Sequence, residues 1–171
     1  MVKEYDGKVR VVLKHMVVHP EQVAKAHLAA CAAAKQGKFV QFYKRFWEKA
    51  FLPYQSARDP SKLGRDNIME IAKGIGLDTN KLKADMDGPE CKAHVQADMA
   101  ELNKFKVGST PTFFINGKLV VGAVGKDQFK QAIDEKLKIA EASGVPGASY
   151  YDKEIMEKGI KQFRSKGEAG K

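Results

Sequence analysis

Two cysteines, Cys31 and Cys91, are the residues of this sequence that could carry sulfur chemistry. They lie too far apart for a local redox pair, and two cysteines are too few for a disulfide framework. Cys31 stands among alanines, where a small buried core residue is favoured. Cys91 follows Pro89 near the predicted start of a helix, a position that favours a thiolate. No base or second cysteine stands beside Cys91, so we predict no catalysis there, and a Cys31–Cys91 disulfide stays open as an alternative.

The four histidines are scattered along the sequence and lack the spacing of a zinc site. His19 precedes Pro20, where a metal ligand or proton carrier is one interpretation and an end-of-strand or helix-cap role is the favoured one. We therefore predict no metal site, and the sequence calls for no cofactor.

The segment Gly108–Gly117, with the sequence GSTPTFFING, has the composition of a tight loop that leads into a buried strand. Thr112–Ile115 is aromatic and β-branched, which favours a strand. Asn116-Gly117 is a strong signal for a type I′ hairpin turn, so Leu119–Val121 is predicted to return antiparallel. Thr110-Pro111 stands in the loop just before the first strand.

Helices are predicted over most of the remaining chain. Near the N-terminus, the β-branched run Val9–Leu13 predicts a buried strand over about Lys8–His15. Pro53 is expected to end the second helix, and Gln55–Lys62 is expected to be a loop. The helices are predicted over Pro20–Lys35, along an apolar stripe from Phe39 to Ala50, after a cap at Asp66, after a cap at Asp78 or Thr79, from Pro89 onward, over Lys126–Ala142 and over Tyr150–Lys158.

Four stretches together resemble the DsbA-like branch of the thioredoxin superfamily, and they cover most of the chain from about Gly7 to Leu137. They are Lys8–His15, His19-Pro20 with Ala29–Ala33, Gln36–Phe39, and Val107–Gly117 followed by Gly122-Ala123. The resemblance implies an α/β thioredoxin-like fold with an inserted helical domain. Residues 1–19 and 104–142 would be the two thioredoxin-like halves, 20–103 the helical insertion and 143–171 a C-terminal helical tail.

The resemblance also assigns a role to Thr110 and Pro111. Pro111 matches the position of a cis-proline in this branch, and the backbone of the preceding residue pairs there with an extended polypeptide substrate. Thr110 and Pro111 are therefore the expected substrate-binding residues. The family is one of protein thiol–disulfide oxidoreductases, and its members begin with a strand and a helix that carries Cys-x-x-Cys.

The sequence contains no Cys-x-x-Cys, so no catalytic residue is assigned and this chain alone is expected to be inactive. The resemblance implies an N-terminally truncated domain that lacks the first strand and the active-site helix. That strand would lie between Lys8–His15 and Thr112–Ile115, and its absence would leave unpaired strand edges. We consider three ways in which these strand edges could be paired. The chain could be a fragment of a longer chain, the strand could be supplied by a second copy or another polypeptide, or Met1–Gly7 and the tail could rearrange to fill the gap.

Net charge and hydropathy limit the classes of partner that we expect this chain to bind. Lys and Arg number 30 against 21 Asp and Glu, a net charge of +9, but the basic residues are spread among acidic ones except in the tail. No basic–aromatic array is present, so we do not expect nucleic-acid binding. No apolar run has the length of a membrane span, and no signal peptide is recognised. The resemblance implies the bacterial periplasm or envelope, with the cytoplasm as the alternative.

Two functions follow. The chain is either a redox-inactive piece of a thiol–disulfide oxidoreductase, or a binding module that holds peptides or a partner chain at Thr110-Pro111. Self-association or strand exchange through an open sheet edge is expected in the second case.

Overall fold

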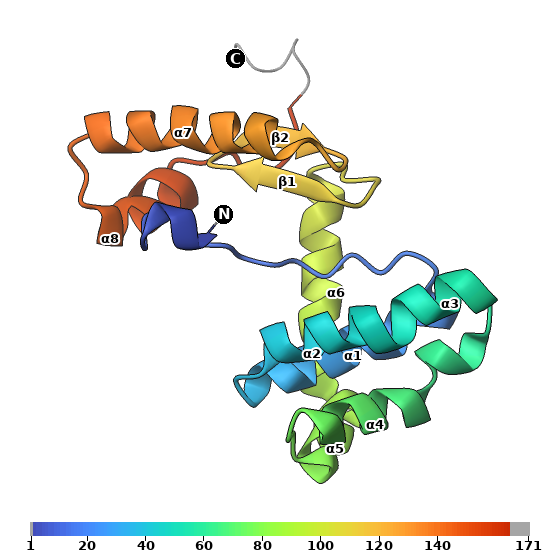
Figure 1. Ribbon diagram of the computed structural model, residues 1–171. Coiled ribbons are helices and arrows are strands. Elements are labelled where there is room, and N and C mark those ends of the chain that lie inside the picture. Colours follow the sequence, from blue (N-terminus) through green and yellow to red (C-terminus); the bar gives the residue numbers. More distant parts are fainter. Residues whose placement is uncertain (1, 165–171) are drawn as a thin grey trace. The chain divides into compact units, whose positions relative to one another are not determined.

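The computed structural model describes residues 2–164, which divide into two compact units (Figure 1). One unit contains the described residues up to Leu13 and from Leu102 onward, and the other contains Lys14–Glu101. The part of the predicted tail beyond residue 164 lies outside the described residues. The four-part domain organisation implied by the resemblance stays a prediction.

The unit of Lys14–Glu101 is helical and has the larger hydrophobic core. The side chains of Phe42, Ile68 and Leu82 are almost entirely buried in it. Its elements are α1 (Pro20–Lys35), α2 (Phe39–Phe46), the π-helix η2 (Trp47–Phe51), α3 (Leu52–Ala57), the 3-10 helix η3 (Pro60–Leu63), α4 (Arg65–Gly74), α5 (Thr79–Asp87) and most of α6 (Pro89–Lys104).

Helix α1 is the centre of this unit because its buried face is made of small residues. Ala29, Ala32 and Ala33 have no exposed surface, and α1 packs closely on α5 and α2. Alanine is also the strongest helix former, so the same residues favour the helix and its close packing. Pro20 occupies the first turn, where its missing N–H has no partner to lose.

Three local predictions in this unit are wrong. Pro53 does not end a helix; it lies in the first turn of α3, directly after η2. Gln55–Lys62 is not a loop throughout, since α3 runs to Ala57 and η3 begins at Pro60. Asp66 does not cap α4, because the helix already begins at Arg65 with Gly64 as its N-cap. Of the two caps predicted for α5, Asp78 or Thr79, Asp78 is the one observed: its Oδ1 accepts the N–H groups of Asn80 and Lys81.

The other unit contains a β-hairpin and the helix α7 (Lys126–Ala142), which run side by side in Figure 1. Strands β1 (Thr112–Ile115) and β2 (Lys118–Val121) pair antiparallel, with Thr112 opposite Val121 and Ile115 opposite Lys118. The turn has φ values of 42° at Asn116 and 83° at Gly117, the two positive values that a type I′ turn requires. The predicted hairpin is confirmed. The 3-10 helix η1 (Val2–Tyr5), the short helix α8 (Gly147–Tyr150) and the π-helix η4 (Tyr151–Glu157) complete the unit.

The predicted buried strand over Lys8–His15 is wrong. No residue of this segment belongs to a strand, and Val11, Val12 and Leu13 are 70%, 54% and 45% exposed. Among the described residues, β1 and β2 pair only with each other, so the segment has no neighbouring strand to hydrogen-bond. The predicted burial of Thr112–Ile115 is also wrong, since Phe113 is 37% and Phe114 46% exposed.

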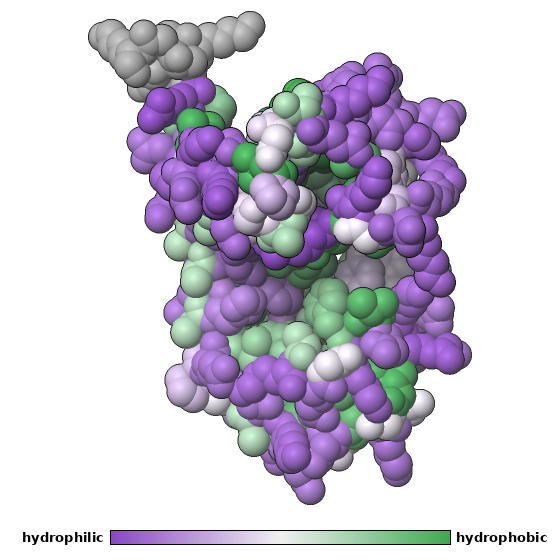
Figure 2. All heavy atoms as spheres, turned by 90° about the vertical axis from the view of Figure 1, so that its left-hand side faces the viewer, coloured by the Kyte–Doolittle hydropathy of each residue, from purple (hydrophilic) through white to green (hydrophobic). Residues whose placement is uncertain are grey.

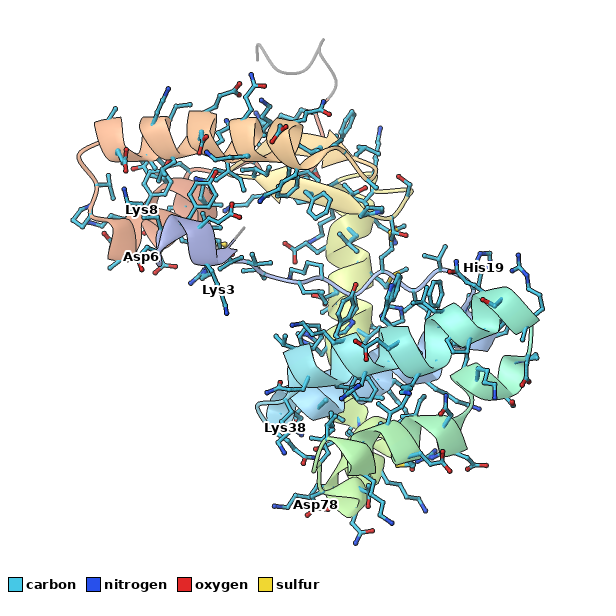
Figure 3. All side chains as sticks on the ribbon, in the orientation of Figure 1. Lys3, Asp6, Lys8, His19, Lys38 and Asp78 are labelled. Atoms are coloured by element: carbon cyan, nitrogen blue, oxygen red, sulfur yellow. A yellow bond between two sulfur atoms is a disulfide. The ribbon has the colours of Figure 1, made fainter. Side chains whose placement is uncertain are left out.

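Polar side chains dominate the surface. On the face shown in Figure 2, hydrophilic residues cover most of the atoms, and hydrophobic residues form smaller patches. Figure 3 shows many charged side chains along the chain. One is Lys38, which lies just before α2 and whose Nζ donates to the carbonyls of Ile75 and Gly76 just after α4. Among the residues that the structure describes, no helix has the length and apolar character to cross a bilayer.

Candidate functional site

The loop before β1 presents an exposed peptide backbone. The Thr110–Pro111 peptide bond is cis, and Ser109, Thr110 and Pro111 are all exposed. Two hydrogen bonds fix the loop to the hairpin: Thr112 Oγ1 donates to the Ser109 carbonyl at 2.7 Å, and the Gly122 N–H donates to the Pro111 carbonyl at 2.8 Å. Within the described part of the chain, Thr110 makes no hydrogen bond, so its N–H and C=O remain available to an extended peptide.

Aromatic side chains position the strand that follows this loop. The ring of Phe113 contacts Phe129 of α7 edge-on, with the centroids 4.8 Å apart. The ring of Phe114 contacts Phe105, just beyond α6, at 5.6 Å. Each of the two phenylalanines therefore packs against one other ring and keeps part of its surface in solvent. Because successive residues of a strand point to opposite faces, each face of β1 carries one of these partly exposed rings.

The N-terminal residues of this unit are fixed on α7 rather than on the hairpin. Tyr5 is buried, and its hydroxyl donates to Asp134 Oδ1 at 2.6 Å. Burial raises the pKa of Tyr5, and the Asp134 carboxylate adds to that shift. The ion pairs Lys8–Glu141 and Lys126–Glu4, at 2.9 and 2.8 Å, hold the same segment.

Cys31 and Cys91 form a disulfide between α1 and α6, with their Cα atoms 5.8 Å apart. Cys31 is 8% exposed and Cys91 is fully buried, so neither sulfur lies at a surface where a substrate thiol could attack it. The predicted burial of Cys31 is confirmed, and its sulfur is bonded to that of Cys91. The alternative that the sequence left open, a bond between them, is the correct one.

Three histidines and an aspartate converge in the helical unit, which the sequence analysis did not predict. His15 precedes α1, His27 lies in α1, and His94 and Asp98 lie in α6. His15 Nδ1 lies 3.1 Å from His27 Nδ1, and the His15 and His94 ring centroids are 5.8 Å apart. Asp98 Oδ2 accepts the His15 backbone N–H at 2.9 Å and lies 3.7 Å from His94 Nε2.

Burial sets the protonation of this cluster. It lowers the pKa of His15, an effect that the Asp98 carboxylate opposes. Burial, with a smaller contribution from His15, lowers the pKa of His27 to about 4. Both rings are therefore neutral at pH 7, and each has a nitrogen lone pair for a hydrogen bond or a metal ion. His19, the histidine that the sequence analysis discussed, is exposed at the start of α1 (Figure 3) and is not part of the cluster.

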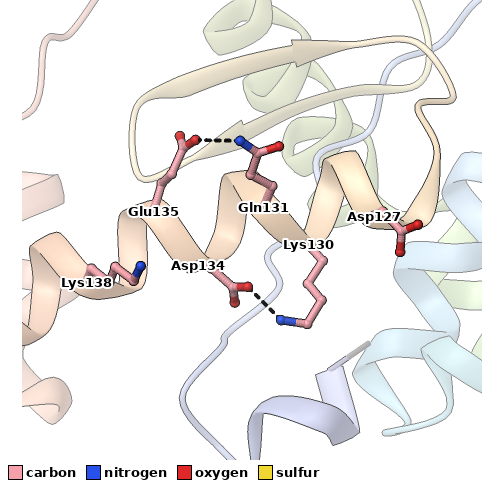
Figure 4. A pocket seen from close by; sticks show the side chains of 6 residues that line it. All are labelled: Asp127, Lys130, Gln131, Asp134, Glu135 and Lys138. Atoms are coloured by element: carbon pink, nitrogen blue, oxygen red, sulfur yellow. Dashed lines mark hydrogen bonds and ion pairs between the residues drawn. The ribbon is translucent and has the colours of Figure 1, made fainter.

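A shallow depression on the surface of α7 is not assigned as a binding site (Figure 4). The charged and amide side chains that line it all lie on the one helix, and two pairs among them are bonded: Lys130 Nζ donates to Asp134 at 2.6 Å, and Gln131 donates to Glu135 at 3.3 Å. Pairs at i and i+4 are typical of a solvated helix surface, so we assign no ligand to it.

Residues 1–135 match the family described as Thioredoxin. This chain belongs to the thioredoxin family. The resemblance predicted from the sequence is thereby confirmed for the superfamily, and the fold is α/β and thioredoxin-like, with a small sheet and many helices.

Two known proteins are similar to this chain over about two thirds of its length. The crystal structure of a thioredoxin-like oxidoreductase from Silicibacter pomeroyi DSS-3 has a TM-score of 0.51 and 31% identity, covering 67% of this chain and 60% of that one. The Na(+)/H(+) antiporter NhaA of Herminiimonas arsenicoxydans is 31% identical over 119 residues, which are 70% of this chain. The matched segment spans 17% of the antiporter, so the thioredoxin-family chain is similar to a small part of that protein.

Proposed function

We propose that this chain is the polypeptide-binding part of a DsbA-like thiol–disulfide oxidoreductase domain, and that the 171 residues alone have no redox activity. The observation that carries the proposal is the exposed Thr110 backbone, which is unbonded within the described chain and is followed by the exposed phenylalanines of β1. An extended peptide bound there would gain main-chain hydrogen bonds and apolar contact together. Because the chain spans only part of its relatives, the activity of a complete protein is itself part of the proposal.

Redox inactivity of the chain follows from its sulfur atoms. The sequence has no Cys-x-x-Cys, and the one disulfide is buried. In an assay of insulin reduction by dithiothreitol, we expect the rate with this chain to equal the uncatalysed rate. Acceleration by the wild-type chain that disappears in the Cys31→Ala/Cys91→Ala variant would refute the inactivity and identify the buried pair as the redox centre.

Binding is tested with an unfolded polypeptide whose cysteines are alkylated, so that no disulfide exchange contributes. We expect the Pro111→Ala variant to bind it roughly tenfold more weakly, a loss of ~1.4 kcal/mol. Pro146→Ala is the matched control, because Pro146 lies at the start of α8, outside the loop, and should leave the affinity unchanged. An NMR titration of the wild-type chain supplies a second readout. Shifts confined to residues far from Thr110 would contradict the proposal even if Pro111→Ala weakened binding.

A second candidate function, self-association through the hairpin, rests on the exposed edges of the sheet. Among the described residues, β1 and β2 hydrogen-bond only to each other, and Phe114 is 46% exposed. Such an edge recruits a further strand unless charge blocks it. We expect light scattering to show a dimer at micromolar concentration and Phe114→Lys to shift it to monomer, whereas Leu52→Lys, at an equally exposed leucine of the helical unit, should not. A wild-type chain that stays monomeric would exclude this function.

The disulfide also favours a compartment. Disulfides form and persist in oxidising environments such as the bacterial periplasm, so the periplasm rather than the cytoplasm is the location that we propose for the natural protein. Thiol titration of denatured protein isolated from its native host, alkylated at lysis, should find no free cysteine. Two free thiols per chain would argue for the cytoplasm.

A further inference from the structure

The histidine cluster combines the donor atoms of a transition-metal site. One ligand atom from each of His15, His94 and Asp98 lies within 4.8 Å of the other two. In a tetrahedral site with metal–ligand bonds of 2.0–2.1 Å, the ligand atoms are about 3.3 Å apart. The three groups therefore need to move closer by about 1.5 Å at most, and the exposed side chain of His94 is free to make that movement.

The buried groups of the cluster are already oriented. Asp98 is 2% exposed, and its hydrogen bond from the His15 backbone fixes the carboxylate beside that residue. His15 is 5% exposed, and its Nδ1 faces His27 Nδ1 at hydrogen-bond distance, which leaves Nε2 as the nitrogen free for an ion. A ligating histidine usually donates the N–H of its far nitrogen to an acceptor such as a carboxylate, a carbonyl or water, which fixes the ring. Here His27 Nδ1 is the group in that position.

The ligand set selects the class of metal. Two imidazole nitrogens and one carboxylate suit zinc, nickel, copper or ferrous iron, whereas magnesium and calcium prefer oxygen atoms alone. His94 is 57% exposed, so the site opens to solvent, and water would complete the coordination. One group opposes binding: Lys14 Nζ lies 3.1 Å from Asp98 Oδ1, and its charge repels a cation. Glu101, 2.7 Å from the same ammonium, offers Lys14 another partner.

We propose that His15, His94 and Asp98 form a binding site for a divalent transition-metal ion such as zinc, with His27 as the residue that positions the His15 ring. The ion would join the segment before α1 to α6, and all of its ligands belong to the unit of Lys14–Glu101. The site thus lies in the helical unit and does not depend on the proposed peptide binding.

The test is zinc binding to the full chain, purified without a histidine tag and titrated against a chromophoric chelator at neutral pH. We expect one zinc ion per chain and at least about tenfold weaker binding by His94→Ala. That substitution removes an exposed side chain from a helix, so it should leave the fold intact. His19→Asn, at an exposed histidine outside the cluster, is the matched control and should bind zinc like the wild type.

A gain of affinity supplies an independent test. Lys14→Gln removes the opposing charge and leaves the three ligand residues unchanged, and it should bind zinc several-fold more tightly than the wild type. In NMR spectra, zinc should shift the ring signals of His15 and His94 and leave those of His19 unchanged. Equal zinc affinity of His94→Ala and wild type, or equally effective competition by magnesium, would overturn the proposal.

Discussion

A two-bond ion pair joins the start of α4 to the end of α5. Arg65 Nη1 and Nη2 donate to the two carboxylate oxygens of Asp87 at 2.9 and 2.6 Å. The hydrogen bonds from Arg65 lower the pKa of Asp87, so the folded state holds this proton less tightly than the unfolded state does. The pair therefore stabilises the fold above the ordinary pKa of an aspartate, and its contribution disappears as the pH falls through the lowered pKa.

This pair gives a pH-dependent prediction. At pH 7, Asp87→Asn should lower the melting temperature by roughly 1–3 °C, as expected for an exposed pair. At a pH below the lowered pKa of Asp87, the wild type and Asp87→Asn should have the same melting temperature. Arg65→Lys keeps the positive charge but loses the bidentate hydrogen bonding. Its melting temperature at pH 7 should therefore lie between those of the wild type and Asp87→Asn. A difference of the same size at both pH values would contradict this account.

Side-chain chemistry could be predicted from the sequence only where the partners are local. His94 and Asp98 are four residues apart on one helix, a spacing that places them on the same face, and this signal was available. His15 and His27 join them only because the segment before α1 and α1 itself pack beside α6. That arrangement depends on tertiary contacts, which sequence spacing does not contain. The disulfide stayed one alternative among several for the same reason.

Helices were predicted better than strands because a helix can be recognised from its own periodicity. The range Lys126–Ala142 was correct to the residue, and so was Thr112–Ile115, whose strand is marked by the adjacent Asn116-Gly117 turn. A strand without such a turn needs a neighbour to pair with. Lys8–His15 has the composition of a buried strand but no partner among the described residues, so its valines lie exposed.

Helix α5 depends on one capping side chain. Asp78 Oδ1 accepts two backbone N–H groups at 2.9 and 3.0 Å. Asp78 is labelled near the bottom of Figure 3. Asp78→Ala should lower the free energy of unfolding by about 1 kcal/mol, the usual cost of a lost N-cap. The measurement is urea denaturation followed by circular dichroism. Asp66→Ala is the control: Asp66 lies in the first turn of α4 and caps nothing, so its loss should be smaller. Equal losses would show that helix-dipole charge, rather than capping, stabilises α5.

The stability of the helical unit should depend on the Cys31–Cys91 bond more than on any single surface contact. The bond spans 60 residues of sequence and joins α1, the centre of that unit, to α6. A crosslink over a loop of that length restricts the unfolded chain strongly, and typical disulfides contribute roughly 2–4 kcal/mol. Cys31→Ala/Cys91→Ala keeps the small apolar character of both positions, so it should lower the free energy of unfolding by that amount and lower the urea midpoint in proportion. Dithiothreitol should then lower the midpoint of the wild type and leave that of the variant unchanged. If the variant and the oxidised wild type unfold at the same midpoint, the bond does not stabilise the fold, and the packing of the alanine face of α1 is sufficient.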